Sequence, residues 1–84
     1  MAVTSAQVRM ARAALNWTVR DLAEATGLHR NTISNIEVGR YSGDPETLAR
    51  IEAVMKRAGV EFLNENGGGP GVRLRKAASS KKTK

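Results

Sequence analysis

Two short amphipathic segments that meet at a glycine restrict the fold of this chain more than any other feature of its sequence. The first runs from Thr18 to Thr26, and the second runs from Arg30 to Glu37 or Val38. In both, apolar residues recur at the spacing of one helix face. Gly27 stands between them, and glycine readily adopts the left-handed conformation that ends a helix and turns the chain. The pattern predicts two short helices joined by a tight turn.

The helix expected over residues 18–26 has a clear local start. Thr18, with Asp21 three residues later, matches a capping box, in which each side chain bonds to the other residue's backbone N–H. Trp17 precedes the cap and can pack against Leu22, so we expect Trp17 to lie in the core.

Two more helices are expected on either side of this pair. Thr4 and Gln7 form a second capping-box pattern, which predicts a helix over residues 4–15. Asp44-Pro45 predicts another helix start, because a capping carboxylate precedes proline at the first helical position. That helix should continue to Ala58 and end at Gly59, with an apolar stripe made of Leu48, Ile51, Val54, Met55 and Ala58.

The pattern changes after Gly59. Residues 60–63 and 71–75 are short, mostly alternating segments on either side of a turn-forming stretch, which predicts a β-hairpin. Residues 77–84 have no apolar pattern and predict a disordered basic tail. The expected fold is therefore mainly α: a four-helix domain over residues 1–59, a hairpin over 60–76 and a tail over 77–84.

Composition limits the possible functions. Eighty-four residues suffice for one modest core, and the absence of cysteine excludes disulfides and cysteine-based zinc sites. The net charge of +6 lies entirely beyond Gly71, because eight basic residues balance eight acidic ones before it. The basic tail could grip phosphates or merely keep the protein soluble, so charge alone does not establish nucleic-acid binding.

Enzymatic and metal-binding roles have little support in the sequence. His29 is the only histidine and has no companions at ligand spacing, and no triad or convincing carboxylate pair is visible. The glycines of residues 67–71 lack the lysine and hydroxyl ending of a phosphate loop and read as a turn. We therefore expect no enzymatic activity, no metal and no cofactor.

The helix expected over residues 30–38 has two distinct faces. Ile33 and Ile36 point inward, while the opposite face groups four short polar or guanidinium side chains, namely Arg30, Asn31, Ser34 and Asn35. Asn can bond an adenine edge, Arg a guanine edge and Ser several partners, so such a face suits the major groove of DNA. We expect these four residues to read bases.

Glu37 is the only acidic residue between Ala25 and Gly43. It borders the inward face of its helix, and Arg12 borders the inward face of the first helix. We therefore expect a partly buried ion pair that joins the two helices; the alternative is two independent surface charges of little energetic value.

The same stretch resembles the Cro and phage-repressor family of helix-turn-helix proteins, also called the xenobiotic-response-element family. The matching segments are Leu22-Ala23, Ala25-Thr26-Gly27, Asn31-Thr32-Ile33-Ser34, Ile36-Glu37-Val38-Gly39 and Asp44 through Ile51. The resemblance covers about residues 5–59. It implies sequence-specific binding of double-stranded DNA as a dimer, with the third helix in the major groove, and it also implies the pair between Arg12 and Glu37.

Two parts of the family pattern differ here. A glutamine that commonly contacts phosphate at the start of the second helix is replaced by Val19, so other donors must hold the DNA backbone; the candidates are Thr18, Arg20, His29, Thr32, Arg40 and Tyr41. A hairpin stands where many members have a fifth helix. Its apolar residues are the expected dimer interface, namely Phe62, Leu63, Val72 and Leu74, with Val54 and Met55 as additional candidates.

We expect a dimeric transcriptional repressor from a bacterium or mobile element, acting in the cytoplasm on the nucleoid at a pseudo-palindromic site, without a membrane partner. A separate regulatory protein could control it. The alternatives are a recombination-directionality or architectural DNA-binding factor and an antitoxin or anti-activator module that holds another protein. RNA binding is disfavoured, because few aromatic residues are available to stack on bases.

Overall fold

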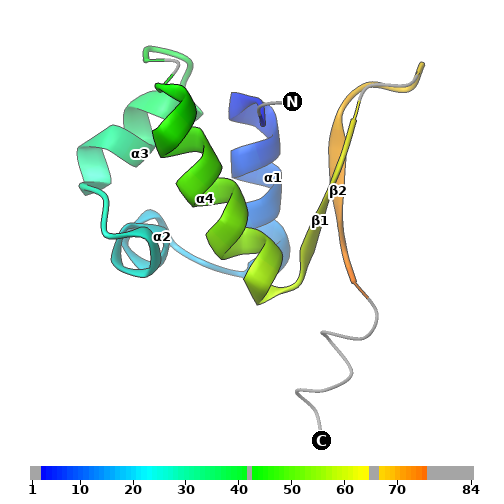
Figure 1. Cartoon of the computed structure of the whole chain (residues 1–84), viewed down its shortest axis with the longest axis horizontal. Coiled ribbons are helices and arrows are strands. Elements are labelled where there is room, and N and C mark those ends of the chain that lie inside the picture. Colours follow the sequence, from blue (N-terminus) through cyan, green and yellow to red (C-terminus); the bar gives the residue numbers. More distant parts are fainter. Residues whose placement is uncertain (1–2, 42, 65–66, 76–84) are drawn as a thin grey trace, which may run out of the picture.

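The computed structural model describes residues 3–41, 43–64 and 67–75. Four helices are followed by a two-stranded antiparallel hairpin (Figure 1). This confirms the predicted fold class, while the predicted tail over residues 77–84 lies outside the described residues. The elements are α1 (Ser5–Leu15), α2 (Val19–Thr26), α3 (Arg30–Glu37), α4 (Pro45–Ala58), β1 (Val60–Leu63) and β2 (Gly71–Leu74).

The helices begin and end at the expected local signals. Capping boxes are present at Thr4 with Gln7 and at Thr18 with Asp21. At the start of α4, Asp44 Oδ1 accepts a hydrogen bond of 2.8 Å from the backbone N–H of Thr47. These caps satisfy backbone donors that have no partner inside a helix, so each start is stabilised locally.

The turn between α2 and α3 is fixed by a glycine and a buried hydroxyl. Gly27 has a φ of 78°, in the left-handed region that side chains disfavour. The Thr26 hydroxyl donates to the carbonyl of Leu22 at 2.8 Å and accepts from the N–H of Leu28 at 3.2 Å. The chain therefore turns tightly while its buried polar groups remain bonded.

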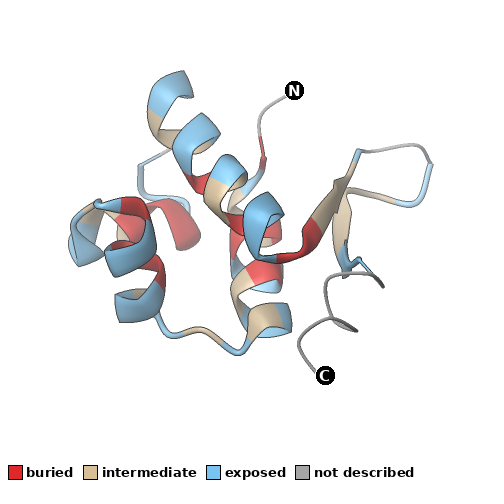
Figure 2. Ribbon diagram, turned by 60° about the horizontal axis from the view of Figure 1, so that its bottom comes forward, coloured by how far each residue is buried: buried red, intermediate tan, exposed pale blue. Residues whose placement is uncertain are grey.

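A single core joins the helices and the first strand (Figure 2). Trp17 packs against this core from a half-buried position. The apolar stripe predicted for α4 is wrong at its last member, because Ala58 is exposed. The chain turns at Gly59 into β1, so Met55 and Val60 occupy the core at that end. The buried hydrophobic residues are Val3, Val8, Ala11, Leu22, Ala23, Ile33, Ile36, Ile51, Met55 and Val60.

The hairpin packs against α1 and the end of α4, and it lies across the domain from α3 (Figure 1). Phe62 pairs with Val72, and both side chains pack on the core. Glu61 pairs with Arg73 one position along the strands, which places them on the opposite face of the sheet. Their side chains form an ion pair at 3.0 Å.

Candidate nucleic-acid interface

The third helix separates an apolar face from a polar one. Ile33 and Ile36 are 0% and 1% exposed, which fixes the helix on the core. Arg30, Asn31 and Ser34 are exposed on the other side. None of the described residues donates to or accepts from these three side chains, so their polar groups are available to a ligand.

Asn35 differs from the other three candidate readers, because it is half-buried. Its backbone carbonyl accepts hydrogen bonds from the backbone N–H groups of Arg40 at 2.9 Å and Tyr41 at 3.2 Å. These bonds turn the chain back after α3 and hold Arg40 and Tyr41 beside the end of the helix, where both are exposed.

His29 caps the start of α3 through its ring. Its Nδ1 accepts a 3.0 Å hydrogen bond from the N–H of Asn31, so Nδ1 must be unprotonated in this arrangement. The neutral ring then carries its proton on Nε2. Because His29 is exposed, that N–H can donate to an oxygen outside the protein.

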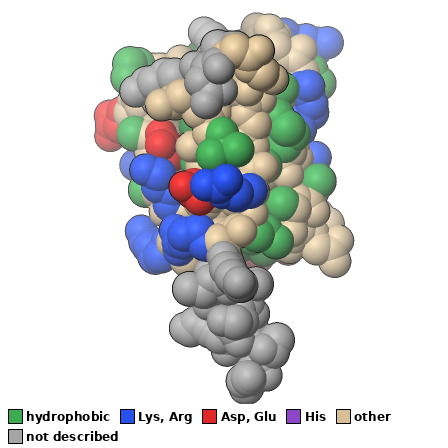
Figure 3. Space-filling model, turned by 90° about the vertical axis from the view of Figure 1, so that its right-hand side faces the viewer, with side chains coloured by type: hydrophobic (Ala, Val, Ile, Leu, Met, Phe, Trp, Pro, Cys, Tyr) green, Lys and Arg blue, Asp and Glu red, His purple; other side chains and the backbone are tan. Residues whose placement is uncertain are grey.

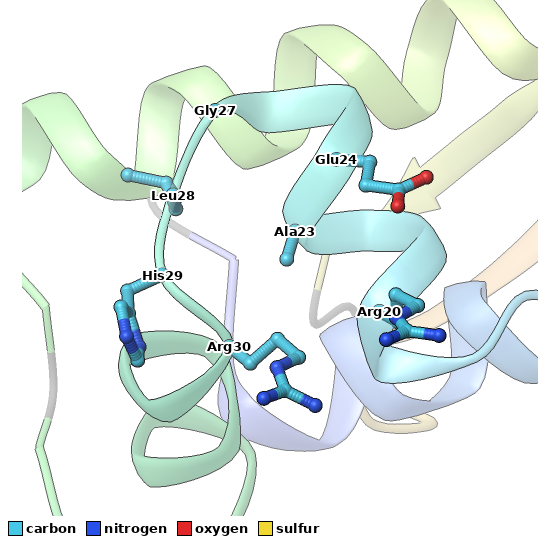
Figure 4. Close-up of a pocket in the computed structure, with 7 residues that line it drawn as sticks. All are labelled: Arg20, Ala23, Glu24, Gly27, Leu28, His29 and Arg30. Carbon is cyan, nitrogen blue, oxygen red and sulfur yellow. The ribbon is translucent and has the colours of Figure 1, made fainter.

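A shallow pocket of about 380 Å³ lies at the junction of α2 and α3 (Figure 4). The guanidinium groups of Arg20 and Arg30 reach this pocket from the two helices, and Glu24 from α2 also lines it (Figure 4). Among residues 3–41, 43–64 and 67–75, no acidic side chain pairs with either arginine. The pocket therefore contains two arginines without an ion-pair partner, together with His29, and such donors suit the phosphates of a DNA backbone.

The start of α2 is already occupied by its own capping box. Thr18 Oγ1 accepts from the N–H of Asp21 at 3.0 Å, and Asp21 Oδ2 accepts from the N–H of Thr18 at 2.9 Å. These two bonds use the N–H groups of Thr18 and Asp21, so neither N–H is available to a phosphate at this helix end. Side-chain donors such as Arg20 are therefore better suited than the Thr18 backbone to hold phosphate.

The expected pair between Arg12 and Glu37 is present. Arg12 Nε and Nη2 donate to the two carboxylate oxygens of Glu37 at 2.8 and 2.9 Å. The side chains are 25% and 5% exposed, so Glu37 is almost out of water. The hydrogen bond to Glu37 raises the pKa of Arg12 above its ordinary value. The pair joins α1 to the end of α3 and neutralises the acid there.

Two residues of α1 have contacts that sequence reasoning missed. Arg9 Nη1 donates to the backbone carbonyl of Glu37, which adds a second link between α1 and α3. Gln7 is 1% exposed, and its Nε2 donates to the carbonyls of Leu63 and Gly71, both at 3.0 Å. Only the capping role of Gln7 has a local signal, because its hairpin partners lie 56 and 64 positions away.

The apolar residues of the hairpin divide between two surroundings. Phe62 and Val72 pack on the core of their own chain, whereas Leu74 is 44% exposed. Leu63 is half-buried on the other face of the sheet. Met55 is 0% exposed, so this additional candidate has no surface to offer a partner. Figure 3, which looks onto the hairpin side, shows hydrophobic side chains exposed beside basic ones.

Within the described part of the chain, no group of three or more His, Cys, Asp or Glu residues could hold a metal ion. In that same part, no helix has the length and apolar character needed to cross a bilayer.

A polar helix face held over a core by a short, glycine-containing turn defines a helix-turn-helix domain that binds DNA. Comparison with protein-family models gives a match described as helix-turn-helix over residues 8–62, which is more than half of the chain. The chain belongs to this Cro and phage-repressor type of helix-turn-helix family, as its motifs indicated. A search of curated proteins gives no match.

Proposed function

We propose that this protein is a sequence-specific, dimeric transcriptional regulator that represses a promoter by binding across it, with α3 in the major groove. The observation that supports it most is the exposed face of Arg30, Asn31 and Ser34, in which no described acid pairs with Arg30. The only acidic residue of α3, Glu37, is buried against Arg12. Phosphates flanking the groove would therefore meet no exposed carboxylate on this helix.

Each reader is assigned by its chemistry. The Arg30 guanidinium suits the O6 and N7 acceptors of guanine, and the Asn31 amide suits the N6 and N7 pair of adenine. Ser34 can bond to more than one base. Asn35 is less exposed than these three and would contact a base only at the edge of the surface.

The DNA backbone would be held on both sides of the reading helix. Arg20 and His29 lie at the pocket beside the start of α3, and Arg40 and Tyr41 lie beside its end. Backbone contacts of this kind fix the position of a protein on the duplex without reading sequence. The complete set of proposed phosphate contacts is Thr18, Arg20, His29, Thr32, Arg40 and Tyr41.

One reading helix covers few base pairs, and a single module of this kind buries about 600–1,000 Å² on DNA. A two-fold dimer would double the contacts and require half-sites about one helical turn apart. The hairpin is the proposed dimer element, through Phe62, Leu63, Val72 and Leu74. Residues 1–59 would then act as the reading head and residues 60–76 as the dimer element.

The edge of β2 supports pairing with a second copy. The bond from Arg75 N to Gly59 O, at 2.7 Å, fixes which residues face β1, because hydrogen-bonded pairs alternate along an antiparallel ladder. In this register, the N–H and C=O groups of Val72 and Leu74 point away from β1. A second β2 could bond to them across a two-fold axis and extend the hairpin to a four-stranded sheet.

Charge selects among the pairings that use those groups. An axis at Leu74 would place Arg73 of one copy opposite Arg75 of the other, which is unfavourable for like charges. If Val72 of one copy faced Leu74 of the other, the two Arg73 side chains would stand directly opposite, which is unfavourable for like charges. If the two Val72 residues face each other, Arg73 lies opposite Gly71 instead. We therefore expect the axis at Val72.

Single cysteines test this axis without background, because the chain has no cysteine of its own. Oxidised Val72→Cys should form a disulfide-linked dimer, since paired Cα atoms about 5.5 Å apart permit one. Arg73→Cys is the matched comparison and should cross-link more slowly. Faster cross-linking of Arg73→Cys would place the two-fold axis at position 73 instead of 72. If both variants stayed monomeric, pairing through the hairpin would be refuted.

A panel of DNA duplexes with single base-pair substitutions tests which residues read bases and which hold the DNA backbone. Asn31→Ala should weaken binding by about 1–3 kcal/mol and relax preference at one base position. Arg40→Ala should weaken all sequences alike. The same loss profile in both variants, measured by fluorescence anisotropy at one salt concentration, would overturn the assignment.

A further inference from the structure

Helix α1 contacts the two parts of the molecule that the proposed function uses. On one side, Gln7 bonds the hairpin; on another, Arg9 and Arg12 bond Glu37 at the end of α3. Since α3 and the hairpin lie across the domain from each other, α1 links them directly, while the end of α4 also supports the hairpin (Figure 1).

Both polar atoms of the Gln7 side-chain amide are hydrogen-bonded. Oε1 accepts from the N–H of Thr4 at 2.9 Å, and the two Nε2 hydrogens go to the carbonyls of Leu63 and Gly71. Leu63 and Gly71 face each other across the hairpin. One buried side chain therefore bonds both strands at the same position.

That position is the end of the hairpin furthest from its covalent attachment. The chain enters β1 at Gly59, and Leu63 lies four residues, about 13 Å, further along the strand. The Glu61–Arg73 pair joins the strands to each other but not to a helix. In addition to the apolar packing of Phe62 and Val72 on the core, Gln7 thus provides a polar attachment that resists swinging of the hairpin about Gly59.

We propose that Gln7 sets the angle between the reading head and the dimer element, and thereby selects the spacing of the two DNA half-sites. This inference rests on the proposed hairpin-mediated dimer. In a two-fold dimer, the angle between hairpin and reading head is the same in both copies. A change in that angle therefore changes the relative orientation of the two α3 helices by twice as much. One added base pair rotates a half-site by about 35°, since a turn contains about 10.5 base pairs.

Gln7→Met tests the proposal, because methionine has a similar length and no hydrogen-bonding amide. The fold should survive, since the carbonyls of Leu63 and Gly71 also take part in the strand ladder and Thr4 is exposed to water. The binding constants of both proteins are measured on duplexes with the selected half-site spacing and with one base pair added or removed. Each duplex is tested at the same salt concentration.

The native protein should prefer its spacing by about tenfold, and Gln7→Met should reduce that preference to about twofold, which is a loss of about 1 kcal/mol of discrimination. The dimerisation constant of Gln7→Met, measured by sedimentation, and the affinity of this variant for a single half-site should equal those of the native protein. Asp44→Ala is the control, because it removes the helix cap of α4 and touches neither Gln7 nor the hairpin. This variant should be less stable yet keep the tenfold preference.

The outcomes separate the two levels of the proposal. A native protein that stays monomeric on a two-site duplex would refute the hairpin-mediated dimer. A dimer in which Gln7→Met keeps the full spacing preference would refute the role of Gln7 alone. Equal loss of preference in Gln7→Met and Asp44→Ala would show an effect of general stability and would also overturn the inference.

Discussion

Removing Arg12 should be the most destabilising change at the ion pair between α1 and α3. Arg12→Met leaves Glu37, whose side chain is 5% exposed, without a counter-ion. A buried charge that loses its partner costs about 3–5 kcal/mol, and we expect the lower end because Arg12 is 25% exposed and water can enter its place. A loss of about 3 kcal/mol lowers Tm by roughly 12–24 °C in a domain of this size.

Removing the charge of Glu37 should cost less. In Glu37→Gln, the Arg12 guanidinium keeps its 3.1 Å bond to the carbonyl of Trp17 and its partial access to water. We expect a loss of about 1 kcal/mol, the scale of one hydrogen bond. The double variant has no unpaired charge, so its loss should be smaller than the sum of the two by about 1–2 kcal/mol.

Urea denaturation followed by far-ultraviolet circular dichroism measures all four free energies of unfolding. Circular dichroism is preferable to fluorescence because Trp17 itself contacts Arg12. If both single variants lost less than about 1 kcal/mol and their effects were additive, the pair would behave as an exposed one and the reasoning from burial would be wrong.

Three other outcomes are expected. The cap bonds from Thr47 lower the pKa of Asp44 below its ordinary 3.8, so the stabilisation that they provide is present above that pH and is lost as the pH falls below it. Asp44→Asn keeps a hydrogen-bond acceptor that does not titrate. This variant should therefore show a smaller fall of Tm between about pH 5 and pH 2. Gly27→Ala should cost about 1 kcal/mol through its φ of 78° alone, whereas Gly43→Ala, with a φ of 79°, should lower Tm further because its Cβ would meet Leu48 at 3.2 Å. Arg20→Gln should reduce the slope of log affinity against log salt by about 0.9 if Arg20 binds one phosphate, and an unchanged slope would exclude that contact.

Local signals predicted most of the fold. Thr4, Thr18 and Asp44 cap helices as their neighbours in sequence indicated, because a cap depends on residues within three positions. Gly27 ends α2 for a similarly local reason. The error at Ala58 arose because the helix period was extended to the last residue of α4, whereas Val60, after the turn at Gly59, fills the core at that end.

Contacts between distant elements were less predictable. The Arg12–Glu37 pair could be expected because both residues border inward faces and because the family resemblance implied it. Gln7 had no comparable signal, since its capping role explained its presence and its hairpin bonds depend on how β1 and β2 return to α1. Arg9 was missed because it bonds a backbone carbonyl, which every residue offers.

The exposed face of α3 is the surface on which the proposed function depends, and selection of duplexes from a random DNA library tests it most directly. At one stated salt concentration, the protein should enrich a pseudo-palindromic sequence with half-sites about one helical turn apart. Asn31→Ala, tested in parallel, should enrich the same sequence with one position in each half-site relaxed. Recovery of no preferred duplex, or of an identical preference after the loss of Asn31, would contradict the proposal that α3 reads the bases.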